Sequence, residues 1–147
     1  MGTMAETATE TITIEAPLER VWQIAVDLES YPTWAHDIKD VNIRSTDDEG
    51  RPLEVEFRAS ALGRSTHYTL KYDYTNAPNE MGWTMLSGDI QRSIDGVWRF
   101  EADGENRTTV RYDLAIDLAV PLPGFVKRRA EVRILNTVRE LKTRAEA

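Results

Sequence analysis

Residues 110–147 read VRYDLAIDLAVPLPGFVKRRAEVRILNTVRELKTRAEA and decide the fold. Apolar and polar residues alternate from Val110 to Leu118, which is the pattern of a half-buried β-strand. The sequence PLPG at 121–124 ends that strand, and residues 125–147 contain neither glycine nor proline, so one helix can continue to residue 147. Its apolar residues recur at helical spacing, at Val126, Ala130, Ile134, Val138, Leu141 and Ala145. The stretch therefore predicts a last strand followed by a long amphipathic helix whose apolar face packs on a sheet.

The same alternation predicts the rest of the sheet. Six earlier strands are expected at residues 7–15, around Val41, at 53–59, at 68–74, and around Trp83 and Trp98. Pro17 suits the first position of a short helix, and Pro32 separates that helix from a second helical turn that carries Trp34. We expect one α+β domain over residues 1–147, with a flexible N-terminus at 1–6. In it a curved, seven-stranded antiparallel sheet wraps around the C-terminal helix, and two short helices follow strand one.

The composition excludes several classes of function. A net charge of −7 opposes nucleic-acid binding, which needs a concentrated basic surface. The absence of cysteine removes disulfides, thiolate zinc sites and cysteine nucleophiles, and the two histidines belong to no triplet with metal-ligand spacing. No apolar run is long enough for a transmembrane helix, and the polar residues 1–10 do not resemble a signal peptide, so we expect a cytoplasmic protein. A monomer and a homodimer both fit the sequence.

A twisted seven-stranded sheet is wider than one helix of roughly 10–12 Å diameter can cover, so we expect a cavity between them. Aromatic side chains suit the lining of such a cavity, because they offer apolar area and, in Tyr and Trp, a polar group that orients a ligand. The expected ligand-binding residues are Trp34, Ile38, Phe57, Tyr68, Leu70, Tyr72, Trp83, Met85, Trp98, Phe100, Tyr112, Leu114 and Phe125. The alternative is that these rings simply fill the core.

The order of motifs resembles that of the START-like (SRPBCC) superfamily, and within it the bacterial polyketide cyclase/dehydrase group and the related coenzyme Q-binding proteins. The motifs are AP at 16–17, VW at 21–22, YPTW at 31–34 and PLPGF at 121–125, before the terminal helix. The resemblance implies a helix-grip fold with a deep hydrophobic cavity, which relatives use without a cofactor for lipids, quinones, polyketides and other aromatic or isoprenoid ligands. It also implies, for aromatase/cyclases, a pocket arginine acting with tyrosines. That arginine position falls near Tyr72 here, so the sequence departs from the cyclase pattern.

Four residues are candidates for chemistry in the cavity. Arg92 shares the parity of Ile94 and Trp98, so in a regular strand it points inward and can grip a carboxylate or phenolate, whereas a bulge near Gly88 turns it outward. The other candidates, all of which can orient a ligand or donate a proton, are Tyr68, Tyr72 and Tyr112. His36 and His67 have no second base or nucleophile at a useful spacing, and we interpret both as solvated.

One segment combines apolar and basic residues at the start of the last helix. Leu122, Phe125, Lys127 and Arg128 suggest a peripheral contact with a membrane, and the alternative is a solvated basic face paired with carboxylates. Three functions therefore follow from the sequence. Binding of a hydrophobic small molecule is the first, a polyketide cyclase/dehydratase-type enzyme the second, and a membrane-facing lipid or quinone chaperone the third.

Overall fold

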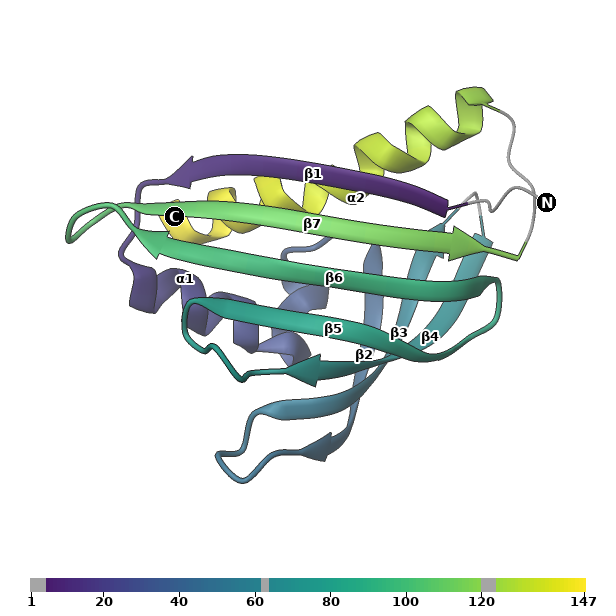
Figure 1. Ribbon diagram of the computed structural model, residues 1–147, viewed down its shortest axis with the longest axis horizontal. Coiled ribbons are helices and arrows are strands. Elements are labelled where there is room, and N and C mark those ends of the chain that lie inside the picture. The colour runs from purple at the N-terminus through teal and green to yellow at the C-terminus, as the bar shows by residue number, and fades with distance from the viewer. Residues whose placement is uncertain (1–4, 62–63, 120–123) are drawn as a thin grey trace.

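The computed structural model describes residues 5–61, 64–119 and 124–147, and among them the side chains of 7–60, 64–119 and 135–147. The elements, in chain order, are β1 (Ala5–Ile14), α1 (Leu18–Val26), the 3-10 helix η1 (Leu28–Thr33), β2 (Ile38–Thr46), β3 (Pro52–Ala61), β4 (Arg64–Asp73), β5 (Glu80–Gly88), β6 (Gln91–Ala102), β7 (Thr108–Leu118) and α2 (Gly124–Glu146) (Figure 1). The expected order of strands and helices is confirmed.

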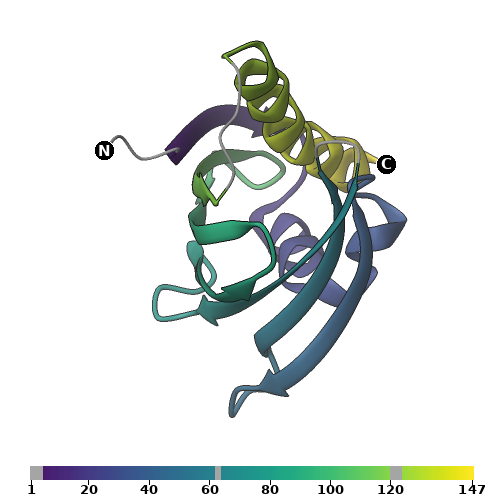
Figure 2. The same cartoon turned by 90° about the vertical axis from the view of Figure 1, so that its right-hand side faces the viewer.

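The seven strands form one antiparallel sheet in the order β1-β7-β6-β5-β4-β3-β2. Consecutive strands from β2 to β7 are neighbours, and β1 closes the meander by pairing with β7. The sheet curls strongly, so that β2, β3 and β4 run across the direction of β5, β6 and β7 (Figures 1 and 2). This curl gives the sheet an inner face, toward the helices, and an outer face.

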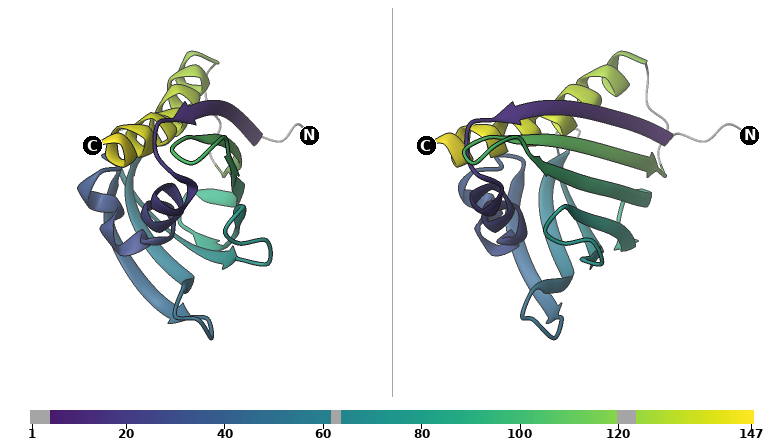
Figure 3. Two further views of the ribbon diagram at one scale, coloured as in Figure 1. Left: turned by 90° about the vertical axis from the view of Figure 1, so that its left-hand side faces the viewer. Right: turned by 60° about the vertical axis from the view of Figure 1, so that its left-hand side comes forward.

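The two short helices lie on the inner side of the sheet, near the end where β7 begins (Figure 3). Val21 and Ala25 of α1 are completely buried, as the spacing of apolar residues predicts. The hydroxyl of Tyr31 in η1 donates a 2.5 Å hydrogen bond to the carbonyl oxygen of Ala25, which joins the two helices. They close this end of the molecule, which we call the closed end.

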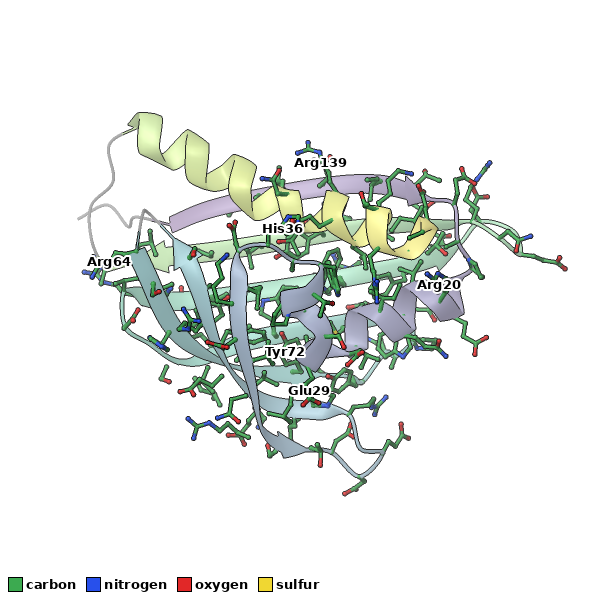
Figure 4. All side chains as sticks on the ribbon, turned by 180° about the vertical axis from the view of Figure 1, so that it is seen from behind. Arg20, Glu29, His36, Arg64, Tyr72 and Arg139 are labelled. Carbon is green, nitrogen blue, oxygen red and sulfur yellow. The ribbon has the colours of Figure 1, made fainter. Side chains whose placement is uncertain are left out.

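The C-terminal half of α2 is anchored at the closed end. Val138, Leu141 and Ala145 are buried there, which confirms this part of the predicted apolar stripe. The guanidinium of Arg20 in α1 donates to the carbonyl oxygens of Ala145 at 2.6 Å and of Arg144 at 3.3 Å, satisfying carbonyls that a helix end otherwise leaves unpaired (Figure 4). The N-terminal half of α2 extends beyond β1 and away from α1 (Figures 1 and 3). No helix in the described part of the chain is long and apolar enough to cross a membrane.

Candidate ligand-binding interior

The inner face of the sheet carries a continuous set of aromatic rings. The centre of this set is a row of cross-strand neighbours, in which Tyr72 pairs with Trp83, Trp83 with Gly96, and Gly96 with Leu114. The ring centroids of Tyr72 and Trp83 lie 5.9 Å apart, and those of Trp83 and Tyr112 lie 5.8 Å apart. We call the residues of the cross-strand row, Tyr72, Trp83, Gly96 and Leu114, the central row.

Gly96 explains how the indole of Trp83 fits into this row. Gly96 has the inward parity of Ile94 and Trp98, both buried, so a side chain at 96 would project into the interior. A β-carbon there would lie 2.3 Å from Cζ2 and 2.7 Å from Nε1 of Trp83. The indole therefore occupies the space that a side chain at 96 would take.

Between the central row and the closed end, side chains fill the interior. Trp22 of α1 makes edge-to-face contacts with Tyr74 and Phe100, at centroid distances of 6.2 and 6.0 Å. Trp98 stacks on Tyr112 at 4.3 Å and lies 6.1 Å from Phe100. Such ring pairs add to the stability that burial itself provides. Here Trp98 and Phe100, which we expected to bind ligand, lie in the hydrophobic core.

Toward the opposite end of the sheet, inner-facing side chains become more accessible. Phe57 and Leu70 are still buried, whereas Tyr68, which stacks on Phe57 at 5.4 Å, is only partly buried. Four other apolar residues that pack against the core are also only partly buried, namely Ile38, Met85, Ile116 and Leu135. We call this side the open end. Five of the expected ligand-binding residues lie here, namely Ile38, Phe57, Tyr68, Leu70 and Met85. Two more, Tyr72 and Leu114, belong to the central row beside it.

The phenol groups on the inner face are neutral. Burial raises the pKa of Tyr68, Tyr72 and Tyr112 well above the ordinary value, so these phenols stay protonated at neutral pH. Within its described residues, the structure records hydrogen bonds for the hydroxyls of Tyr31 and Tyr74 but none for those three. The buried Nε1 of Trp34 also has no hydrogen-bond partner among the described residues. These groups are available to a ligand that carries hydrogen-bond acceptors.

Charged side chains are absent from the buried set among the described residues, whose buried polar members are Thr66, Gln91 and Thr108. Arg92, which we expected inside if its strand were regular, is exposed. The reason is a shift of register between Gln91 and Ser93, where β6 has one residue more than β7, so the extra residue leaves the inner face. Of the two orientations that the sequence left open for Arg92, the structure has the outward one, so Arg92 does not supply the pocket arginine that the resemblance to aromatase/cyclases implies.

A polar cluster at the open end was not foreseen from the sequence. The Nε2 group of Gln91 donates to the hydroxyl of Thr66 at 3.0 Å, and that hydroxyl donates to the carboxylate of Asp89. The same carboxylate accepts a 2.9 Å hydrogen bond from the backbone N–H of His67. These bonds fix the β5–β6 turn against the start of β4. The signal in the sequence was Gln91, a polar residue at a strand start that becomes inward-facing only because of the bulge.

The two histidines lie outside the interior. His36 is exposed and contacts the carboxylate of Glu140 in α2, and the exposed His67 lies 3.7 Å from the carboxylate of Asp89. Among the described side chains, no three His, Asp or Glu residues are grouped so as to hold a metal ion. Leu122 lies outside the described residues, and the side chains of Phe125, Lys127 and Arg128 are not described either.

A groove with a volume of about 1320 Å³ lies against the outer face of the sheet. Its lining includes small and charged outward-facing residues such as Thr84, Val97, Arg99 and Asp113. Arg99 and Asp113 are already paired with each other at 2.9 Å. The lining also includes the four residues of the central row, but its many charged side chains suit a purely apolar ligand less well than the aromatic inner face does.

The curled sheet, the long terminal helix and the aromatic interior define the helix-grip fold of START-like proteins. The family model for polyketide cyclase / dehydrase and lipid transport proteins matches residues 5–146, and the chain belongs to this family. No curated protein matches the sequence.

Solved structures with the same fold are distant in sequence. A START superfamily protein from Mycobacterium smegmatis is 23% identical, with a TM-score of 0.86, over 95% of this chain and 97% of that one. The Zhui aromatase/cyclase from Streptomyces sp. R1128 is 16% identical, with a TM-score of 0.81, over 97% of this chain and 94% of that one. The major latex-like protein 151 from Panax ginseng is 10% identical, with a TM-score of 0.71, over 98% of this chain and 99% of that one. At these identities the likeness concerns the fold alone.

Proposed function

We propose that this protein binds a neutral, largely apolar small molecule with hydrogen-bond acceptors, such as a quinone, a polyketide or a lipid with carbonyl groups. The ligand occupies the space between the open end of the sheet and α2. The observation that carries the proposal is that the inner face joins aromatic rings from neighbouring strands, and that the phenols of Tyr68, Tyr72 and Tyr112 stay protonated there, with no hydrogen bond from their hydroxyls to another described residue recorded.

The chemistry of these hydroxyls favours carbonyl oxygens as their partners. A ligand carbonyl that accepts a hydrogen bond from one of these phenols gains about 0.5–1.5 kcal/mol. An anionic ligand is disfavoured, because the described interior has no buried cation to compensate a buried carboxylate. The surrounding rings contribute apolar area to an aromatic or isoprenoid body.

Native mass spectrometry of the purified protein tests whether a small molecule is retained. A titration with 2-methyl-1,4-naphthoquinone, followed by quenching of tryptophan fluorescence, then tests binding directly, because the quinone has two carbonyl acceptors on an apolar body. We expect saturable, one-to-one quenching, unchanged in Arg92→Ala, since Arg92 is exposed. Quenching that rises linearly without saturation, together with no retained molecule, would contradict the proposal.

A cyclase or dehydratase activity is the second candidate. It is supported by the fold shared with the Zhui aromatase/cyclase and by tyrosines that can polarise ketone oxygens. Because the pKa values of these tyrosines are raised, the phenols serve as hydrogen-bond donors and not as bases. Incubation with a poly-ketone thioester distinguishes the two functions: a carrier returns the substrate unchanged, whereas an enzyme yields a cyclised or dehydrated product.

A further inference from the structure

We propose that the sheet opens along a seam between residues 85–88 of β5 and residues 91–94 of β6, that the side chain of Gln91 holds this seam closed, and that the ligand reaches the inner face through it. The last part rests on the proposed function, whereas the opening of the seam does not.

β5 and β6 are paired over only part of their length. The register of β5 with β6 ends at Thr84 and Asp95, and no cross-strand pair is recorded between the described residues 85–88 and 91–94. At this end β5 remains paired with β4, and β6 remains paired with β7. The connection between the two strands accordingly makes a wide bend (Figure 1). Opening the seam therefore breaks none of the recorded strand pairs.

A bulge in each strand explains why the two strands part. Relative to β4, β5 has one extra residue, Leu86, and relative to β7, β6 has one extra residue, Arg92. A bulge bends its strand and increases the local twist, so β5 and β6 no longer run side by side beyond the two bulges. Both extra residues are exposed, Leu86 with 51% of its surface. The seam thus follows from the same irregularity that turns Arg92 outward.

The side chain of Gln91 crosses from β6 to β4 at the end of β5. Its Nε2 group donates the 3.0 Å hydrogen bond to the hydroxyl of Thr66, and both residues are buried. Gly88 leaves room for this crossing, because a β-carbon there would lie 2.7 Å from Oε1 of Gln91. The hydrogen bond joins strands on opposite sides of the seam, so Gln91 acts as a clasp.

The turn between the two strands is divided in the same way. The N–H of Asp89 donates to the carbonyl oxygen of His67 in β4, at 3.0 Å. The carbonyl oxygen of Ile90 instead accepts a 2.8 Å hydrogen bond from the N–H of Ala119, directly after β7. Neighbouring residues of one turn are therefore tied to opposite sides of the seam.

Apolar side chains lie on the inner face directly behind the seam. Met85 of β5 is partly buried against the core, and Ile94 of β6 is buried. A local opening exposes these side chains while the paired parts of β5 and β6 stay together, and such openings cost less free energy than global unfolding. The seam thus provides a transient path from solvent to apolar surface.

Native-state amide hydrogen exchange tests the opening without any ligand. In the wild type, the amides of residues 85–94 should exchange roughly tenfold faster than those of 80–84 and 95–99, because a local opening exposes only the first group. Gln91→Met keeps the length of the side chain but removes its hydrogen bond, and should accelerate exchange over 85–94 about fivefold. Gln91→Ala serves if the methionine variant does not fold.

The matched control is Asn79→Ala, at the other end of the same two strands. The Nδ2 group of Asn79 donates a hydrogen bond of equal length, 3.0 Å, to the carbonyl oxygen of Phe100 in β6, where β5 and β6 are paired. Its loss should leave exchange over residues 85–94 unchanged.

Stopped-flow mixing with 2-methyl-1,4-naphthoquinone tests entry through the seam. A clasp that controls only the path to the site affects binding and release alike, because the free and bound states at either end of the path are unchanged. In Gln91→Met we therefore expect the association and dissociation rate constants to rise together, about fivefold each, with an unchanged dissociation constant.

The outcomes separate the parts of the proposal. Exchange over residues 85–94 that is as slow as in the paired segments of the wild type overturns the seam. Unchanged exchange in both Gln91 variants, or equal acceleration in Asn79→Ala, overturns the clasp. Faster exchange in Gln91→Met with an unchanged association rate overturns entry through the seam and leaves ligand binding intact. Failure of the wild type to bind the naphthoquinone overturns the proposed function, while exchange still decides whether the seam opens.

Discussion

The indole of Trp83 lies directly over the α-carbon of Gly96, its cross-strand neighbour, and no β-carbon fits between them. This relationship places the largest side chain of β5 against the smallest residue of β6. It allows the ring to lie along the sheet between Tyr72 and Tyr112. The position of one glycine thus makes room for the indole in the central row.

Gly96→Ala should lower the free energy of unfolding by about 1–3 kcal/mol, because the methyl group forces the indole into neighbouring rings. Urea denaturation followed by circular dichroism measures the effect. The matched control is Gly82→Ala on the adjacent strand, where a β-carbon would meet only the carbonyl oxygen of Gly96, at an ordinary 3.6 Å. Equal effects of the two substitutions would show that the indole does not depend on the space at Gly96.

Arg20→Ala should loosen the end of α2. The guanidinium group of Arg20 donates to the carbonyl oxygens of Arg144, Ala145 and Ala147, and a cation at a helix C-terminus also interacts favourably with the helix dipole. We expect a loss of about 1 kcal/mol and faster amide exchange over residues 141–146. Gln23→Ala is the control, since the hydrogen bond recorded for the Gln23 side chain within the described part of the chain is to Glu19 of α1. Unchanged exchange in Arg20→Ala would mean that the cap is not formed in solution.

The sequence was sufficient for the fold because two patterns in it are clear, the alternation of apolar and polar residues in the strands and the helical spacing of apolar residues in the last helix. Alternation from Tyr68 to Tyr74 fixes which residues face inward, and the structure buries Leu70, Tyr72 and Tyr74 as this pattern predicts. What alternation cannot show is where a strand gains a residue. The bulge between Gln91 and Ser93 depends on the pairing of β6 with β7, so the sequence alone left both orientations of Arg92 open.

The candidate site was predictable only in part, for a related reason. Alternation assigns Trp98 and Tyr68 to the same inner face, but it does not tell which of them packs against α1 and which lies at the open end. That difference comes from the placement of α1 and α2 over the sheet, which is a tertiary property. Gly96 gave no sequence signal of its own, because its role depends on having Trp83 as its cross-strand neighbour.

Asp113→Asn should reduce stability at neutral pH but not in acid. Hydrogen bonds from Arg111, more than the opposing effect of burial, lower the pKa of this carboxyl below its usual value, with help from Thr9 and Arg99. A carboxyl whose pKa is lower in the folded state stabilises the protein above the unfolded-state value near 4, and this contribution is lost as the pH falls through the folded-state value.

We expect Asp113→Asn to cost about 0.5–1 kcal/mol at pH 7, as for partly exposed ion pairs, and the difference from the wild type to shrink below pH 4. Urea denaturation at pH 7, 5 and 3 measures it. Asp95→Asn, on the same outer face, is the control, because no ion pair of Asp95 is recorded among the described residues. A difference that stays constant down to pH 3 would exclude the ionised carboxylate as its source.

Tyr72→Phe should weaken binding of 2-methyl-1,4-naphthoquinone without destabilising the free protein. The lost hydroxyl has no partner in the described structure, so its removal leaves stability unchanged or slightly higher, while the ligand carbonyl loses a donor. We expect affinity to fall about fivefold to tenfold. Because burial raises the pKa of Tyr72 well above 10, the affinity of the wild type should be constant from pH 6 to 9.

Tyr31→Phe is the control that separates binding from packing. The hydroxyl of Tyr31 is engaged with the carbonyl oxygen of Ala25, so its loss should cost about 1 kcal/mol of stability, with little change in affinity. Fluorescence titration and urea denaturation of both variants give the two values independently. If Tyr72→Phe destabilises the free protein as Tyr31→Phe does and leaves the affinity unchanged, the Tyr72 hydroxyl belongs to the core and does not contact the ligand.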